Sequence, residues 1–122
     1  MKVFVYYNLH RHCWSVRCQQ PGHPEYGRVI AHMDTVHLRG CTFRVGKAGR
    51  ERVREEGRKN VHAGVVGCLA FGDIKRISTR EITYNPYKYD TFVFKNTEKP
   101  VHEAEAVVMH NKKVYQASAQ KG

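Results

Sequence analysis

The sequence predicts an α+β fold that is mostly antiparallel β, as a small barrel or a sandwich-like sheet, with one basic helix. Short segments of alternating apolar and polar residues, separated by turns rich in Gly, Pro and Asn, are typical of antiparallel strands. One segment, residues 47–59, instead places Arg50, Arg54 and Arg58 on one side of a helix at about 100° per residue. With 122 residues and an apolar fraction of 41%, the chain is long enough to bury a core. We therefore expect a single β-rich domain over residues 1–122.

The first half of the chain is expected to form a hairpin followed by three short strands. The hairpin joins residues 2–9, KVFVYYNL, to residues 13–18, CWSVRC. Both faces of residues 2–9 are largely apolar, which suits a central strand or a strand covered by a partner subunit. The three short strands are expected at residues 28–32, 35–38 and 41–45, with breaks around Met33–Asp34 and Arg39–Gly40.

The second half of the chain has six segments with a strand pattern. They lie at residues 61–71, 74–78, 80–84, 91–95, 106–110 and 113–118. Gly64 lies inside the first of them, where another backbone or a ligand approaches closely. Residues around Pro86 are not expected to form the interior of a regular strand, because proline lacks an N–H donor. Pro100 is expected to open one helical turn through Glu103. The last two segments are expected to form a hairpin around Asn111–Lys112.

The charge of the chain predicts an anionic partner. The formal net charge is +10 and the sequence pI is about 9.7. Arginine offers planar, bidentate donors that suit phosphate, which makes phosphate the best match. The alternative is a basic protein without such a partner. No apolar run approaches the roughly 18 residues of a membrane span, and the N-terminus lacks a leader pattern, so we expect a soluble cytosolic protein without a membrane partner.

The four cysteines are expected to be reduced thiols, and we expect no metal and no cofactor. If residues 13–18 form one strand, Cys13 and Cys18 point to opposite faces. Five residues at about 3.3 Å each hold them roughly 16 Å apart. Neither a disulfide nor a local chelate fits that spacing. The alternative is a metal site in which a distant residue completes a set from His10, His12 and Cys13.

The common signatures of enzymes are missing from the sequence. There is no GxGxxG, no P-loop, no HExxH and no GxSxG motif. Carboxylates are too sparse for a two-metal nuclease. A metal-independent ribonuclease stays open, because two histidines and a lysine suffice for general acid–base cleavage and the chain has 8 histidines. We favour a protein that binds its ligand without catalysis.

The first candidate ligand site is the basic side of the predicted helix and the segment after it. Arg50, Arg54 and Arg58 offer forked donors at one-turn spacing, which suits phosphate oxygens. Asn60 and His62 follow them and suit a ribose or a base edge. The alternative is a solvated helix whose arginines pair with its own glutamates, with a few tenths of a kcal/mol for each pair.

The second candidate ligand site is the segment ITYNPYKYDTFVF. Tyr84, Tyr87, Tyr89 and Phe92 crowd a turn that Pro86 restrains, and Asn85 offers a polar group beside them. A base stacks on such rings for roughly 1–3 kcal/mol, whichever base it is. The alternative is a packing cluster that closes the end of a sheet.

Four stretches give the chain a family resemblance: YYNLHRHCWSVR, GRVIAH, FRVGKAGRERVREEGRKNVHAG and YNPYKYDTFVF. In their order and in its length, the chain resembles the Thoeris anti-defence proteins of the first described type, which phages encode. The resemblance implies a β-rich protein of the host bacterial cytoplasm that assembles as a dimer or a higher form such as a hexamer, with pockets at subunit contacts. It further implies that the protein holds cyclic ADP-ribose isomers, the alarm signal of bacterial TIR-domain enzymes, without altering them. Some members also hold cyclic oligonucleotides. We add Arg28, within GRVIAH, to the candidate ligand residues.

Two other functions stay open at this point. The charge and the interleaved aromatic residues also suit a phage accessory protein that binds DNA or RNA. A small metal-independent nuclease or phosphodiesterase is the other alternative.

Overall fold

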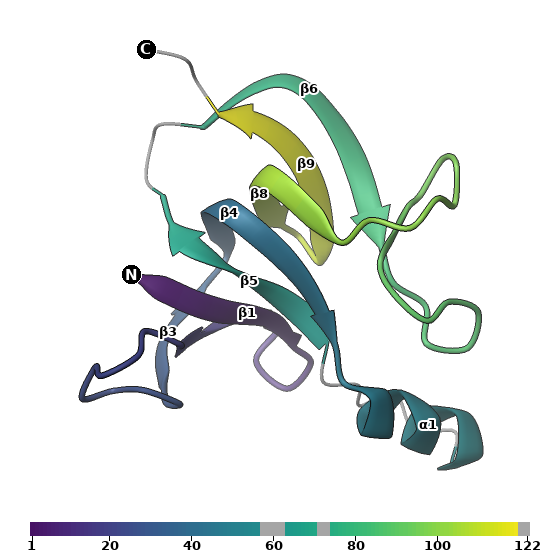
Figure 1. Ribbon diagram of the computed structural model, residues 1–122, viewed down its shortest axis with the longest axis horizontal. Coiled ribbons are helices and arrows are strands. Elements are labelled where there is room, and N and C mark those ends of the chain that lie inside the picture. Colours follow the sequence, from purple (N-terminus) through teal and green to yellow (C-terminus); the bar gives the residue numbers. More distant parts are fainter. Residues whose placement is uncertain (57–62, 71–73, 120–122) are drawn as a thin grey trace.

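The computed structural model describes residues 1–56, 63–70 and 74–119 (Figure 1). In chain order its elements are β1 (Lys2–Asn8), β2 (Cys13–Cys18), β3 (Val29–Met33), β4 (Thr35–Val45), α1 (Lys47–Glu56), β5 (Ala63–Leu69), β6 (Ile74–Thr83), β7 (Val93–Phe94), β8 (Glu103–His110) and β9 (Lys113–Ala119). The nine strands described form one antiparallel sheet in the order β3-β2-β1-β5-β4-β8-β9-β6-β7. Within the same residues, no helix is long and apolar enough to cross a membrane.

The predicted hairpin of β1 and β2 is confirmed. Val5 pairs with Val16 and Tyr7 pairs with Trp14, so that apolar side chains of both strands share the buried face. The turn is held by the side chain of Asn8, whose Oδ1 accepts hydrogen bonds from the two backbone N–H groups of residues 10 and 11 at 3.0 and 3.1 Å. An asparagine that bonds its own backbone in this way is typical of a turn.

The strands predicted at residues 35–38 and 41–45 are one strand, β4, so the break expected at Arg39–Gly40 is wrong. Val36 and Leu38 are buried in the first half of β4, and Cys41 and Phe43 are buried in the second half. The buried positions therefore change from even to odd residue numbers within the strand. Gly40 lies between the two pairs with φ +61, and the register with β5 shifts there. A bulge with a glycine in the left-handed region explains the switch. β4 bends at this point and keeps both halves on the core.

Three other expectations for the second half are wrong. The strands predicted at residues 74–78 and 80–84 are one strand, β6, whose register with β9 shifts along its length. The strand predicted at residues 91–95 is reduced to the two residues of β7. Pro100 opens no helical turn, because it forms a bridge with Val93 and leads directly into β8. The hairpin around Asn111–Lys112 is confirmed.

The predicted α+β class is wrong, because the structure is nearly all antiparallel β-sheet and the sheet is open. A closed barrel is excluded since β3 and β7 end the sheet on opposite sides. α1 is a ten-residue segment that Figure 1 places beyond the end of β4, away from the strands. It has too little apolar surface to form a layer. The end of the predicted helix, residues 57–59, lies outside the described residues.

The core lies on the inner face of the curved sheet. Its members are buried side chains from seven of the strands and the segments around them: Val3, Val5, Trp14, Val16, Val36, Leu38, Cys41, Phe43, Val65, Ile82, Phe92, Val101, Ala104, Val107, Met109 and Val114. On the opposite face, Gly64 leaves room for Phe4, because an added Cβ would lie 2.9 Å from that ring and 2.3 Å from the carbonyl oxygen of Val5. The close backbone approach expected at Gly64 is confirmed.

Candidate functional site

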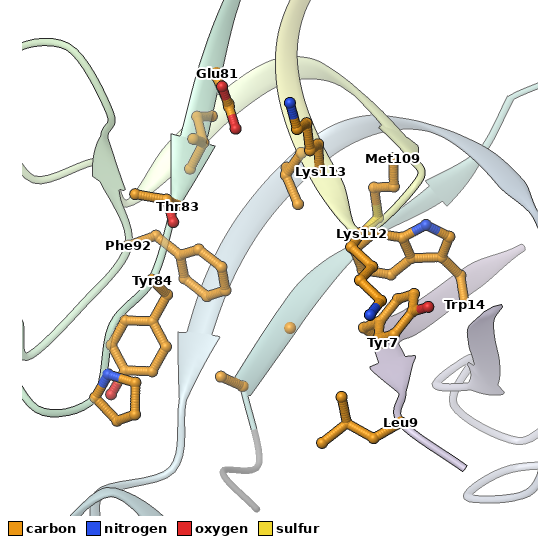
Figure 2. Close-up of a pocket in the computed structure, with 15 residues that line it drawn as sticks. Tyr7, Leu9, Trp14, Glu81, Thr83, Tyr84, Phe92, Met109, Lys112 and Lys113 are labelled. Carbon is orange, nitrogen blue, oxygen red and sulfur yellow. The ribbon is translucent and has the colours of Figure 1, made fainter. Parts of the chain in front are cut away.

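A pocket of about 270 Å³ opens on the inner face of the sheet (Figure 2). The described residues that line it come from the β1–β2 hairpin, the start of β5, the end of β6 with the loop after it, and the β8–β9 hairpin: Tyr7, Leu9, Trp14, Ala63, Gly64, Glu81, Ile82, Thr83, Tyr84, Pro86, Phe92, Met109, Lys112, Lys113 and Val114. The curvature of the sheet brings these distant segments together. The pocket is therefore a product of the whole fold.

Two pairs of aromatic rings form opposite sides of the pocket. Tyr7 and Trp14 meet edge to face, with ring centroids 5.2 Å apart and planes at 82°. Tyr84 and Phe92 lie 5.2 Å apart with planes at 35°. Figure 2 shows the two pairs on either side of the open space. Facing aromatic surfaces of this kind suit a planar ring.

A lysine lies at the rim of the pocket. The Lys112 Nζ atom is 5.5 Å from the centroid of the Tyr7 ring, and Figure 2 shows the lysine beside that ring. Asn111 and Lys112 both have positive φ, +48 and +64, as a two-residue hairpin turn requires. The turn geometry therefore fixes where Lys112 lies. Two other charged residues line the pocket, Lys113 and Glu81, and Glu81 is paired with Lys95 at 3.3 Å.

Two buried hydrogen-bonding groups of the pocket residues have no partner within the described part of the chain. They are the indole Nε1 of Trp14 and the hydroxyl of Tyr84. Leaving a buried polar group unpaired costs about 1–3 kcal/mol. Burial raises the pKa of Tyr84, against the opposing effect of Arg50 and Arg54, so the hydroxyl keeps its proton at neutral pH. Both groups are covered by protein atoms, so the rings line the pocket with their apolar surfaces.

A second pocket of about 220 Å³ adjoins the first. It shares Tyr7, Trp14 and Lys112 with it and is otherwise lined by polar side chains that include His12 and Asp34. Lys112 thus lies between an aromatic space and a polar one. A ligand with an apolar ring and a polar tail matches this arrangement.

The structure brings the two sequence-predicted sites together, because arginines of α1 bind the loop after β6. Arg50 Nη1 donates to the carbonyl oxygen of Asp90 at 2.7 Å. Arg54 Nε donates to the carbonyl oxygen of Pro86 at 2.7 Å. Arg54 Nη2 donates to the carbonyl oxygen of Tyr89 at 3.1 Å and to the Asp90 carboxylate at 2.9 Å. These bonds hold the loop that supplies Tyr84 and Pro86 to the pocket.

The remaining predicted site residues are spread over the chain. Asn85 holds the loop, since its side chain accepts a hydrogen bond from the backbone N–H of Tyr87 at 2.9 Å. The Tyr87 side chain is exposed outside the pocket lining. Arg28 is exposed in the loop before β3, 3.8 Å from Glu25. The predicted residues that line the pocket are Tyr84 and Phe92. Arg58, Asn60 and His62 lie outside the described residues.

The pocket residues that the sequence analysis did not single out include Tyr7, Trp14 and Lys112. The sequence carried a signal for Tyr7 but none for Lys112. Tyr7 has the same parity as Val3 and Val5, so it belongs to the face that became the core. The Asn111–Lys112 turn was predicted, but a turn residue carries no sign of the segment that it faces across the sheet.

These observations define a small all-β protein with an aromatic-walled pocket between the two halves of one curved sheet. The family model described as Mycobacterium phage L5 gene 82 protein matches residues 1–117. The Gene 82 protein of Mycobacterium phage L5 is 39% identical over 122 residues, which cover 89% of this chain and 90% of that protein. The chain therefore belongs to the phage L5 gene 82 protein family. No solved structure matches it. The sequence-based expectation of a phage protein is confirmed; these matches carry no support for the Thoeris anti-defence assignment.

Proposed function

We propose that this phage protein binds and sequesters a small anionic molecule with a planar ring, in the host cytoplasm and without altering it. A cyclic nucleotide such as a cyclic ADP-ribose isomer, the ligand that the sequence resemblance implies, has this chemistry. The observation that carries the proposal is the pocket itself. It combines two aromatic pairs on opposite sides with a lysine at the rim.

Each part of such a ligand has a counterpart in the pocket. The base lies between the Tyr7–Trp14 pair and the Tyr84–Phe92 pair, where stacking contributes roughly 1–3 kcal/mol. A phosphate lies near Lys112, which exchanges its contact with the Tyr7 ring for a charged hydrogen bond. Arg50 and Arg54 act one step away, by holding the loop that forms one wall.

The chemistry of the lining favours binding over catalysis. Among the described residues that line the first pocket there is no histidine and no cysteine, and the one carboxylate belongs to Glu81. His12, Cys13 and Asp34 line only the second, more polar pocket. Glu81 is paired with Lys95, so its carboxylate is already engaged within the protein. A ligand that enters this pocket is therefore expected to leave it unchanged.

Calorimetry with a cyclic ADP-ribose isomer tests the proposal. We expect saturable binding that weakens at least about tenfold in Lys112→Gln, which loses about one charged hydrogen bond. Binding should also weaken in Trp14→Phe, which loses part of the aromatic surface of the pocket. Lys99→Gln makes the same charge change at an exposed position outside the pocket lining, so it is the matched control and keeps full affinity. Melting curves confirm that each variant is folded.

The same complex separates binding from turnover. Mass spectrometry of the small molecule released by heat is expected to recover it intact. Recovery of a cleaved product would contradict the proposal and favour the phosphodiesterase alternative. Absence of binding by the wild type, or equal affinity of wild type and Lys112→Gln, would also contradict it.

A further inference from the structure

Two arginines lie over aromatic rings on the outer face of the sheet, opposite the pocket. Arg17 of β2 lies over the Tyr6 ring, with Cζ 5.6 Å from the centroid. Arg44 of β4 lies over the Phe4 ring at 5.8 Å. Tyr6 and Phe4 are stacked on β1, 5.9 Å apart with planes at 30°. The four side chains form one row across β2, β1, β5 and β4, because Gly64 of β5 leaves space for Phe4. We call this row the outer arginine–aromatic row.

The positive charge of this row is not neutralised within the described residues. Neither Arg17 nor Arg44 has a carboxylate within ion-pair distance there, whereas Arg28, Arg50 and Arg54 each have one. Arg17 Nε is also buried without a hydrogen-bond acceptor. Contact with the rings holds both guanidinium groups in place before any ligand arrives. Two pre-positioned guanidiniums with no carboxylate partner in the described part of the chain indicate an anionic ligand.

A hydrogen-bonded polar chain continues the same face beside Tyr6. Asn8 Nδ2 donates to Ser15 Oγ at 3.1 Å, and Ser15 Oγ lies 3.0 Å from His32 Nδ1. Ser15 is fully buried, while His32 is exposed. Tyr6 lies directly opposite Ser15 in the pairing of β1 and β2. The face therefore offers stacking groups, phosphate-binding groups and polar side chains in one continuous area.

We infer that the outer face of β2, β1, β5 and β4 binds single-stranded nucleic acid. Phosphates contact Arg17 and Arg44, and unstacked bases lie on the guanidinium planes and on the exposed part of Tyr6, as in other single-strand binding surfaces. The net charge of +10 supplies the long-range attraction. A duplex is disfavoured because its bases are already stacked on each other and cannot use these planes. This activity is separate from the pocket, whose residues point to the other face.

Fluorescence anisotropy with a labelled oligothymidylate of about 15 nucleotides tests this inference. We expect Arg17→Gln and Arg44→Gln each to weaken binding roughly tenfold. Each is also expected to reduce the slope of log K against log salt by about 0.7, the value for one lost phosphate contact on a single strand. Arg28→Gln removes the same charge from an exposed arginine that is paired with Glu25. It should change the affinity and the salt slope by much less than the other two variants.

The pocket variants keep the two activities distinguishable. Lys112→Gln and Trp14→Phe are expected to leave oligonucleotide affinity unchanged, whatever their effect on a cyclic nucleotide. Equal affinity of the wild type and the Arg17→Gln/Arg44→Gln double variant, with both folded by their melting curves, would overturn the inference. Tighter binding of duplex DNA or of anionic phospholipid vesicles than of the single strand would overturn it as well.

Discussion

Replacing Arg54 with alanine is expected to loosen the loop after β6 from α1. Arg54 makes three of the hydrogen bonds that join these segments, to the carbonyl oxygens of Pro86 and Tyr89 and to the carboxylate of Asp90. A lysine at this position keeps the positive charge but lacks the planar guanidinium with its several donors. It can therefore replace at most some of these three hydrogen bonds. The change therefore tests whether this arginine is a structural clamp of the loop.

The expected loss of stability is about 1–2 kcal/mol. A net hydrogen bond is worth about 0.5–1.5 kcal/mol, which gives roughly 1–3 kcal/mol for the two carbonyl contacts. The Arg54 side chain is 38% exposed and that of Asp90 is 74% exposed, so solvent screens the ion pair to less than about 1 kcal/mol and weakens the other two contacts. For a domain of this size the melting temperature should fall by roughly 4–8 °C.

Thermal unfolding of Arg54→Ala, Arg54→Lys and Arg28→Ala measures this effect. We expect Arg54→Ala to be the least stable and Arg54→Lys to recover part of the loss. Arg28→Ala should melt close to the wild type, since Arg28 makes one long, exposed ion pair. If Arg54→Ala melts like the wild type but loses affinity for a cyclic nucleotide, the clamp is refuted. The phosphate-binding arginine stripe expected from the sequence would then be supported.

Three further predictions concern reactivity, pH and self-association. Cys68 is exposed, while burial raises the pKa of Cys41 to about 12. A thiol reagent at neutral pH should therefore modify Cys68 and spare Cys41. Equal labelling of the two thiols by mass spectrometry would contradict this. Hydrogen bonds from Lys88 and Tyr89 lower the pKa of Glu98 in the folded protein. The ionised Glu98 therefore makes a small contribution to stability above the ordinary pKa of a glutamate, and this contribution is lost as the pH falls through the lowered pKa. NMR titration should show the pKa of Glu98 rising in Lys88→Ala. Ile30 is exposed on the edge strand β3, which can pair with the same strand of a second copy. Light scattering should therefore detect a dimer that Ile30→Lys dissociates. A wild-type mass of 14.1 kDa at all concentrations would disprove this prediction.

The parts of the fold that the sequence predicts well are set by local signals. The β1–β2 and β8–β9 hairpins follow from alternating apolar residues on both sides of short turns. The continuity of β4 was missed because its bulge at Gly40 depends on pairing with β5, which no local pattern of residues 35–45 contains. The α+β class was wrong because helical charge spacing in residues 47–59 says nothing about whether a helix packs on a sheet.

The candidate site was predicted in part. Tyr84 and Phe92 were expected to form an aromatic group and do line the pocket, because both lie near the turn that Pro86 restrains. Tyr7 and Lys112 were missed, since their contact joins residues far apart in the sequence and depends on how the sheet curves. The contacts of Arg54 with backbone carbonyls were equally out of reach, because carbonyl acceptors leave no signature in side-chain types.

The fluorescence of Trp14 is the most direct measurement of whether the pocket binds a cyclic nucleotide. Trp14 is the single tryptophan of the chain, and it lines the pocket. Adding a cyclic ADP-ribose isomer should change its emission in a saturable way, with a weaker half-saturation in Lys112→Gln and an unchanged one in Lys99→Gln. Emission that stays constant while calorimetry detects binding would place the ligand elsewhere. Constant emission without any binding would contradict the proposed function itself.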